Sequence, residues 1–132
     1  MSKGNQTEND YMVFVFNNTA MPSYGSNLYV HLHTADPGEA GTGSTNEADY
    51  TGYAAVSVSR DSGGFTVTNN QAVNTAEVTF PQCTGGANSI THASVTTVGG
   101  QILYSGALTA SLSVSNLITP RFPAGTLIFQ ED

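Results

Sequence analysis

Hydrophobic and polar residues alternate along most of the chain, with the two-residue period of a half-buried strand. The clearest strand starts at Leu28, where apolar residues occupy every second position up to Leu32, while His31 and His33 point to the opposite face. Shorter segments of strand character follow at steady intervals, at residues 53–59, 65–68, 76–80, 90–98, 101–110, 112–114 and 126–129. The pattern predicts a mainly β fold: an antiparallel β-sandwich, jelly-roll or immunoglobulin-like, of about eight strands.

Turn-forming residues separate these segments. Residues 61–64, Asp-Ser-Gly-Gly, predict a hairpin that joins segment 53–59 to segment 65–68. Gly99-Gly100 predicts another tight turn, and Asn69-Asn70 is interpreted as an interruption. Residues 39–49 are rich in Gly, Ser and Thr and have no apolar anchor, so we expect a loop that contacts a ligand or a neighbouring subunit.

The N-terminal region does not alternate. Thr7 followed by Asp10 resembles a capping box, which predicts a short helix from Glu8 to Asn17. The apolar run at residues 11–16 is rich in Val and Phe, so a strand is the alternative. We expect an N-terminal arm with a docking helix at residues 1–25, followed by a β-sandwich domain at residues 26–132.

Composition and charge exclude several functions. The net charge is −7 with only three Lys and Arg residues, which argues against direct binding to nucleic acid. The longest apolar run has six residues, too short for a signal segment or a membrane span, so we expect no membrane partner and a protein that stays in the cytoplasm unless it joins a particle. The single cysteine, Cys83, allows no internal disulfide and no zinc cluster.

His31 and His33 are the one metal-like pair, because strand residues two apart share a face. Their spacing from Gly25 is similar to the first motif of cupins, which makes a metal-binding cupin-like domain the third functional alternative. The similarity ends there, because Glu39 comes too late and His92 has no second motif around it. We therefore expect both histidines to be polar strand residues that face solvent or a neighbouring subunit, and we expect no cofactor.

The sequence favours a non-enzyme. It has no Gly-x-Ser-x-Gly motif, and Cys83 has no neighbouring base. Exposed tyrosines can anchor interfaces or stack on sugars, but half-buried strand tyrosines are the favoured interpretation here. The candidate interface residues are Tyr11, Met12, Phe14, Phe16, Tyr50 and Tyr53. We expect them to serve a homotrimer.

Several segments together resemble a family of small tailed-bacteriophage proteins that are commonly labelled tail-fibre or minor structural proteins. The segments are residues 28–43, Tyr50-Thr51-Gly52-Tyr53-Ala54, Val78-Thr79-Phe80-Pro81, Gly85-Gly86 and Leu103-Tyr104-Ser105-Gly106-Ala107-Leu108. The hydrophobic segment before Asn18-Thr19-Ala20 is also similar, although richer here in Val and Phe. The family position of His31 is more usually small or apolar, so the resemblance does not support a metal there.

The resemblance implies a structural protein of the virion, assembled in the host cytoplasm. From the sequence we expect a capsid decoration protein that stabilises the head lattice, because 132 residues without a repeat cannot form a fibre shaft. The alternative is a tail-fibre or tail-tip component that contacts host surface glycans. The partners would be the major capsid protein or tail proteins of the same phage. Head or tail location, host, copy number and the role of residues 39–49 stay open.

Overall fold

The computed structural model describes residues 1–131, and it confirms the prediction of a mainly β fold with a short N-terminal helix. The described strands form antiparallel sheets, a five-stranded one in the order β1-β8-β7-β2-β3, a three-stranded one in the order β10-β5-β4, and the pair β6-β9. The elements are β1 (Ser2–Lys3), α1 (Asn5–Asn17), β2 (Asn27–His33), β3 (Val56–Ser59), β4 (Phe65–Thr68), β5 (Gln71–Asn74), β6 (Val78–Thr79), β7 (Asn88–Thr96), β8 (Ile102–Val114), β9 (Arg121–Phe122) and β10 (Ile128–Gln130).

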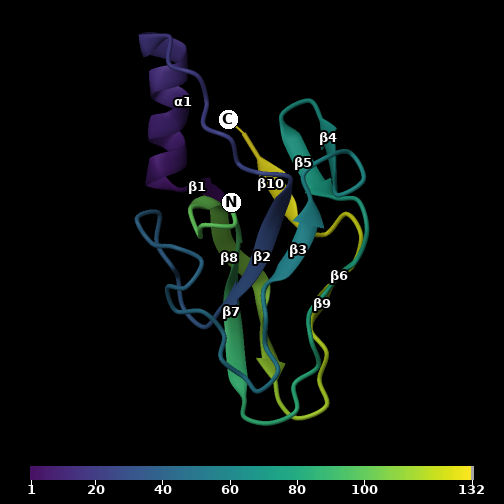
Figure 1. Cartoon of the computed structure of the whole chain (residues 1–132). Coiled ribbons are helices and arrows are strands. Elements are labelled where there is room, and N and C mark those ends of the chain that lie inside the picture. The colour runs from purple at the N-terminus through teal and green to yellow at the C-terminus, as the bar shows by residue number, and fades with distance from the viewer. Residues whose placement is uncertain (132) are drawn as a thin grey trace.

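The two larger sheets pack in a sandwich-like arrangement, with α1 projecting beyond them (Figure 1). An aromatic pair joins the sheets, Tyr104 of β8 with Phe129 of β10 at 5.7 Å between ring centroids. Val30 and Leu32 of β2 lie in the shared core and are at most 1% exposed. The other face of β2 is also covered, because the loop after it folds back and Ala48 donates a backbone hydrogen bond to the carbonyl of Leu32 at 2.9 Å.

The predicted hairpin between segments 53–59 and 65–68 is wrong. Strand β3 pairs with β2, whereas β4 pairs with β5 in the other sheet. Asp61 carries the chain from one sheet to the other, since its side chain accepts hydrogen bonds from the backbone of Gly63 and Gly64. The hairpin turn is instead at Asn69-Asn70, where Asn69 adopts a left-handed φ of 54°. Strand β5 was missed because its four residues show no alternation.

Helix α1 begins three residues earlier than predicted. Strand β1 pairs with β8, and Gly4 is the N-cap, so Thr7 and Asp10 lie inside the helix and do not form a capping box. A Cβ atom at Gly4 would lie 2.3 Å from the carbonyl oxygen of Ile102. The close passage of the chain over β8 therefore determines where the helix starts.

Asn74 connects the end of β5 to the returning C-terminal chain. Its side-chain amide donates to the carbonyls of Ala76 at 2.9 Å and Pro123 at 3.0 Å, and its side-chain oxygen accepts from the backbone of Leu127 at 2.9 Å. The residue is 1% exposed. This amide thus ties the chain after β9 to the end of the β5–β10 ladder.

Replacing Asn74 with Ala should lower the free energy of unfolding by roughly 2–4 kcal/mol, because several buried backbone groups lose their partner. Urea denaturation measures the change. The control is Asn27→Ala, whose exposed side chain makes one long contact of 3.5 Å with Ser26, and which should change stability by less than about 0.5 kcal/mol. Equal effects of the two substitutions would contradict this role of Asn74.

Candidate functional site at the helix and the gap between the sheets

The base of α1 is attached to the β-domain by polar contacts. The hydroxyl of Thr7 donates to the carbonyl of Ile102 at 2.7 Å. The carboxylate of Asp10 accepts hydrogen bonds from Gln6 at 2.9 Å, from Gln101 at 3.0 Å and from the hydroxyl of Tyr24 at 3.0 Å. Both Thr7 and Asp10 are buried, so these contacts fix the direction in which the helix leaves the domain.

The surroundings of Asp10 favour its charged form. Burial by itself raises the pKa of the Asp10 carboxyl, but the hydrogen bonds from Gln101, Gln6 and Tyr24 outweigh burial, and the net pKa is lowered. Burial and the neighbouring carboxylate raise the pKa of Tyr24 to about 12, so its hydroxyl stays a donor. A single negative charge therefore organises the attachment of the helix.

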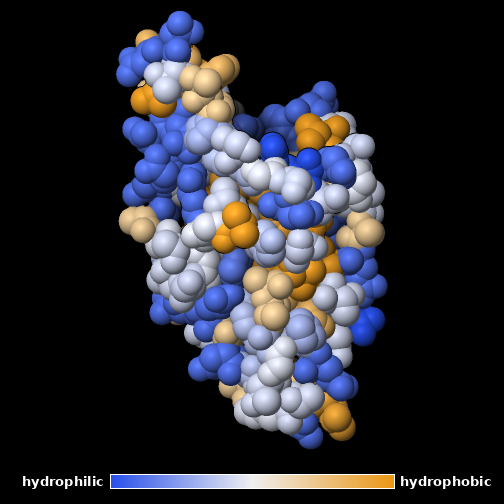
Figure 2. Space-filling view, in the orientation of Figure 1, coloured by the Kyte–Doolittle hydropathy of each residue, from blue (hydrophilic) through white to orange (hydrophobic). Residues whose placement is uncertain are grey.

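The outer half of α1 is exposed and apolar. Phe16 is 73% exposed and Phe14 51%, and the helix has no charged side chain after Asp10. The free end stands clear of the sheets, and Figure 2 shows hydrophobic surface there. The other exposed apolar residues of this half are Tyr11, Met12 and Val15. The structure thus gathers four candidate interface residues, Tyr11, Met12, Phe14 and Phe16, on one element; their contact with a partner stays a prediction.

Tyr50 and Tyr53 lie elsewhere, in the core. Tyr50 is 3% exposed, and its hydroxyl donates to the carbonyl of Pro81 at 2.7 Å. Tyr53 is half-buried, stacks on Phe80 at 6.3 Å between ring centroids and donates to Glu47 at 2.8 Å. The folded-back loop places both rings between layers, which agrees with the favoured interpretation of half-buried tyrosines, and Tyr50 has almost no exposed surface to serve as the interface anchor also considered.

The two strand histidines are covered by the same loop, which corrects the expectation that they face solvent. His33 is completely buried, with its Nδ1 atom 2.8 Å from the carbonyl of Thr45 and its Nε2 atom 2.8 Å from the hydroxyl of Ser94. His31 is half-buried, and its Nδ1 atom lies 2.5 Å from Glu47.

Burial lowers the pKa of His33, in spite of the opposing hydrogen bond to Thr45, so the ring is neutral in the fold at pH 7. Both of its nitrogens already have protein partners. Within residues 1–131 no group of three or more His, Cys, Asp or Glu residues is arranged to hold a metal ion. The arrangement around β2 is therefore that of a packed polar layer, which the loop at residues 39–49 closes.

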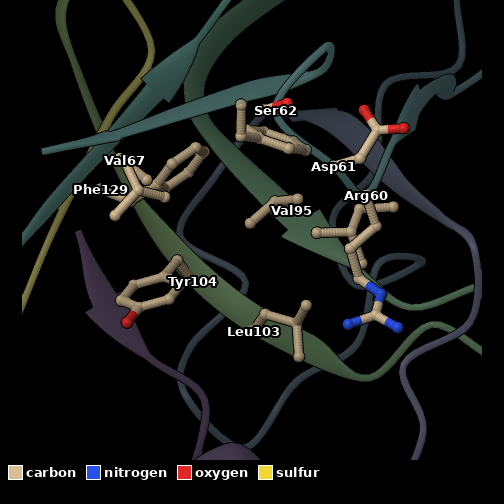
Figure 3. A pocket seen from close by; sticks show the side chains of 11 residues that line it. Arg60, Asp61, Ser62, Val67, Val95, Leu103, Tyr104 and Phe129 are labelled. Carbon is tan, nitrogen blue, oxygen red and sulfur yellow. The ribbon is translucent and has the colours of Figure 1, made fainter.

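The sequence did not reveal an apolar cavity that lies between the two larger sheets and has a volume of about 470 Å³. Figure 3 shows Arg60 and Asp61 together on one side of it, and Val67, Phe129 and Tyr104 on the other. The remaining lining residues are Leu28, Ser62, Phe65, Ala72, Val95 and Leu103. They come from strands far apart in the chain, so no local motif could have indicated the cavity.

Replacing Asp10 with Ala should loosen α1 and leave the β-domain folded. Hydrogen bonds to a charged group contribute about 1.5–3 kcal/mol, so amide hydrogens of residues 5–17 should exchange roughly tenfold faster or more, as measured by mass spectrometry. Because the folded pKa of Asp10 is lowered, its contribution in the wild type is complete above its ordinary value and is lost as the pH falls through the lowered pKa. Glu8→Ala, at an exposed acid in the first turn of the same helix, loses only an interaction with the helix dipole and should raise exchange by about fivefold at most.

Replacing His33 with Ala should destabilise the protein by roughly 2–4 kcal/mol, because it leaves a cavity and unpaired polar groups. The wild type should also lose stability as the pH falls below about 6.5, since the unfolded chain then binds a proton that the buried ring resists. Urea denaturation across pH 5 to 8 measures both. His92→Ala, at a half-buried ring beside Thr91, is the control and should cost less; equal costs would contradict the buried role of His33.

Comparison with known proteins gives the family. Residues 2–130 match the family model described as Podophage GP4 fiber I protein gp80, which spans nearly the whole chain and agrees with the resemblance seen in the sequence. No curated protein matches the chain. Among the described residues no helix is long and apolar enough to cross a membrane. The chain belongs to this family of podophage fibre proteins and is a structural protein of the tailed-bacteriophage virion.

Proposed function

We propose that the chain is a subunit of a fibre on the phage tail, with a structural and non-catalytic role. The observation that carries this proposal is the match of residues 2–130 to a family whose description names a fibre protein. That description favours the tail-fibre alternative over the capsid decoration expected from the sequence. Head decoration therefore becomes the competing outcome of the experiment below.

The shape of the subunit supports a short fibre segment or joint. Its one helix has 13 residues, about 20 Å in length, and its sheets close into a single compact core. Such a domain supplies one rigid link in a larger assembly. The length of the fibre would come from other chains or from several copies of this one.

The exposed helix supports a role in attachment. Its outer half displays aromatic and aliphatic side chains that a neighbouring molecule would cover. We propose that α1 joins copies of the chain into a homotrimer and links it to tail proteins of the same phage, during assembly in the host cytoplasm. The net charge of −7 would keep free subunits apart until this helix binds.

The state of the reactive side chains supports a non-catalytic role. His33 is neutral, buried and hydrogen-bonded at both ring nitrogens. Cys83 is fully buried, and its thiol donates to the carbonyl of Gly85 at 3.1 Å. Contact with host glycans gains no support from Tyr50, since its ring lies in the core.

Labelling of intact virions tests the location. Gold-labelled antibody against the chain should bind at the tail of purified particles, and quantitative mass spectrometry should find a copy number far below that of the major capsid protein. A second antibody against the capsid protein is the matched control for access to the head. Labelling spread over the head, with copies comparable to the capsid protein, would instead establish decoration and overturn the fibre assignment.

A further inference from the structure

We infer that the free end of α1 of one copy inserts into the cavity between the sheets of a second copy of this chain. The inference deepens the proposed fibre role, because it names the surface that receives the helix. It joins two features that the fold leaves uncovered, an apolar helix end and an apolar cavity. Both surfaces are apolar, so contact between them would remove apolar area from water on each side.

The inserted group is the helix ridge, defined as Met12, Val15 and Phe16. These residues are 51%, 46% and 73% exposed, and they follow the i, i+3, i+4 spacing that places side chains on one helix face. The opposite side of the helix carries Thr7 and Asp10, which are buried against the β-domain. The ridge therefore faces away from the chain's own core.

The receiving cavity has the size and lining for this ridge. An apolar cavity of about 150 Å³ holds one benzene ring, so about 470 Å³ has room for side chains of the volume that the ridge presents. Its walls include Phe65, Val95 and Phe129. Insertion would remove apolar surface from water on both partners.

A chain cannot fill its own cavity with its own ridge. The contacts of Thr7 and Asp10 fix the base of α1, and Figure 1 shows the helix extending away from the sheets that enclose the cavity. The chain between the helix and β2 returns along it, with Tyr24 bound to Asp10. A second copy can supply a cavity for the ridge and a ridge for the cavity, because each copy carries one of each.

Charge complementarity points to the same pairing. A helix C-terminus carries partial negative charge, and the last turn of α1 has no basic residue to balance it. Arg60 lies at the cavity, and none of the ion pairs among residues 1–131 involves it; its Nε atom donates to the carbonyl of Gly25. When the ridge enters the cavity, the free helix end meets this guanidinium.

The contact is heterologous, since a ridge binds a cavity and not another ridge. Such contacts close into rings when the rotation allows it and otherwise extend into filaments. A single contact of one helix end is smaller than a standard interface of about 800 Å² per partner, so it would be weak alone. In a closed ring of three copies the contacts act together, which connects this inference to the proposed homotrimer.

Variants on the two surfaces test the inference in the full-length protein. The helix variant carries Met12→Gln, Val15→Gln and Phe16→Gln, and the cavity variant carries Ala72→Phe, which fills the space. Val67→Glu is a second cavity variant at a side chain that is 70% exposed, so it keeps the test valid if Ala72→Phe does not fold. Leu117→Asn, at an apolar residue 69% exposed outside both surfaces and with a left-handed φ that suits Asn, is the matched control.

Analytical ultracentrifugation measures the mass of each protein. The wild type and the control should assemble to three times the 13.7 kDa chain mass, and the helix variant and either folded cavity variant should weaken association by roughly thirtyfold or more. At high protein concentration, which the weak single contact requires, a mixture of helix variant and cavity variant should form 1:1 pairs and nothing larger, since together they hold one intact ridge and one intact cavity. Circular dichroism and melting temperature check that each variant is folded.

Three results would overturn the inference. They are a wild type that stays monomeric at high concentration, cavity variants that assemble as well as the wild type, and a mixture that forms no pair at high concentration. If only the helix variant loses assembly, then helices pack on one another. The virion experiment is independent of these results. If antibody labels the tail and the cavity variants assemble as well as the wild type, only the insertion is refuted. If assembly requires the ridge and the cavity but antibody labels the head, only the fibre role is refuted.

Discussion

The buried side-chain amide of Asn74 is the contact on which the path of the C-terminal chain into the three-stranded sheet depends. It satisfies backbone groups just after β5, just after β9 and just before β10. Since β5 and β10 carry Ala72 and Phe129, the same amide positions one wall of the cavity. An apolar side chain at this position would leave those groups unpaired in the core, at a cost comparable to a large part of the stability of a small domain.

Strand β2 shows how few charged residues this fold needs. Its apolar face packs in the common core through Val30 and Leu32, and its polar face is sealed by the loop, with His33 bonded to Thr45 and Ser94. No buried side-chain polar atom of the described residues lacks a hydrogen-bond partner. Uncharged Ser, Thr and Asn side chains thus satisfy most of the interior, and Asp10 at the base of α1 is the buried acid among the described residues.

The two ends of the helix differ in their surroundings. Its base is held by hydrogen bonds to the charged Asp10, whereas Phe16 and its neighbours at the free end are exposed. A helix of this length is marginal in isolation, so the contacts at the base contribute to its order. This difference between the ends is the basis for the proposed assembly through the free end.

The period-two pattern by itself determined that the chain is mainly β and where β2 and β4 lie, because alternation is a local property of a half-buried strand. The continuous apolar run from Tyr11 to Phe16 likewise indicated the exposed end of the helix, since it has more apolar surface than a short element can bury in its own core. Only the tertiary structure decided that β3 and β4 belong to different sheets and that Asn69-Asn70 forms the hairpin turn, because pairing depends on distant partners. Tertiary structure alone also buried Tyr50 and His33 beneath a loop and created the cavity, whose walls combine residues from Leu28 to Phe129 that no local pattern connects.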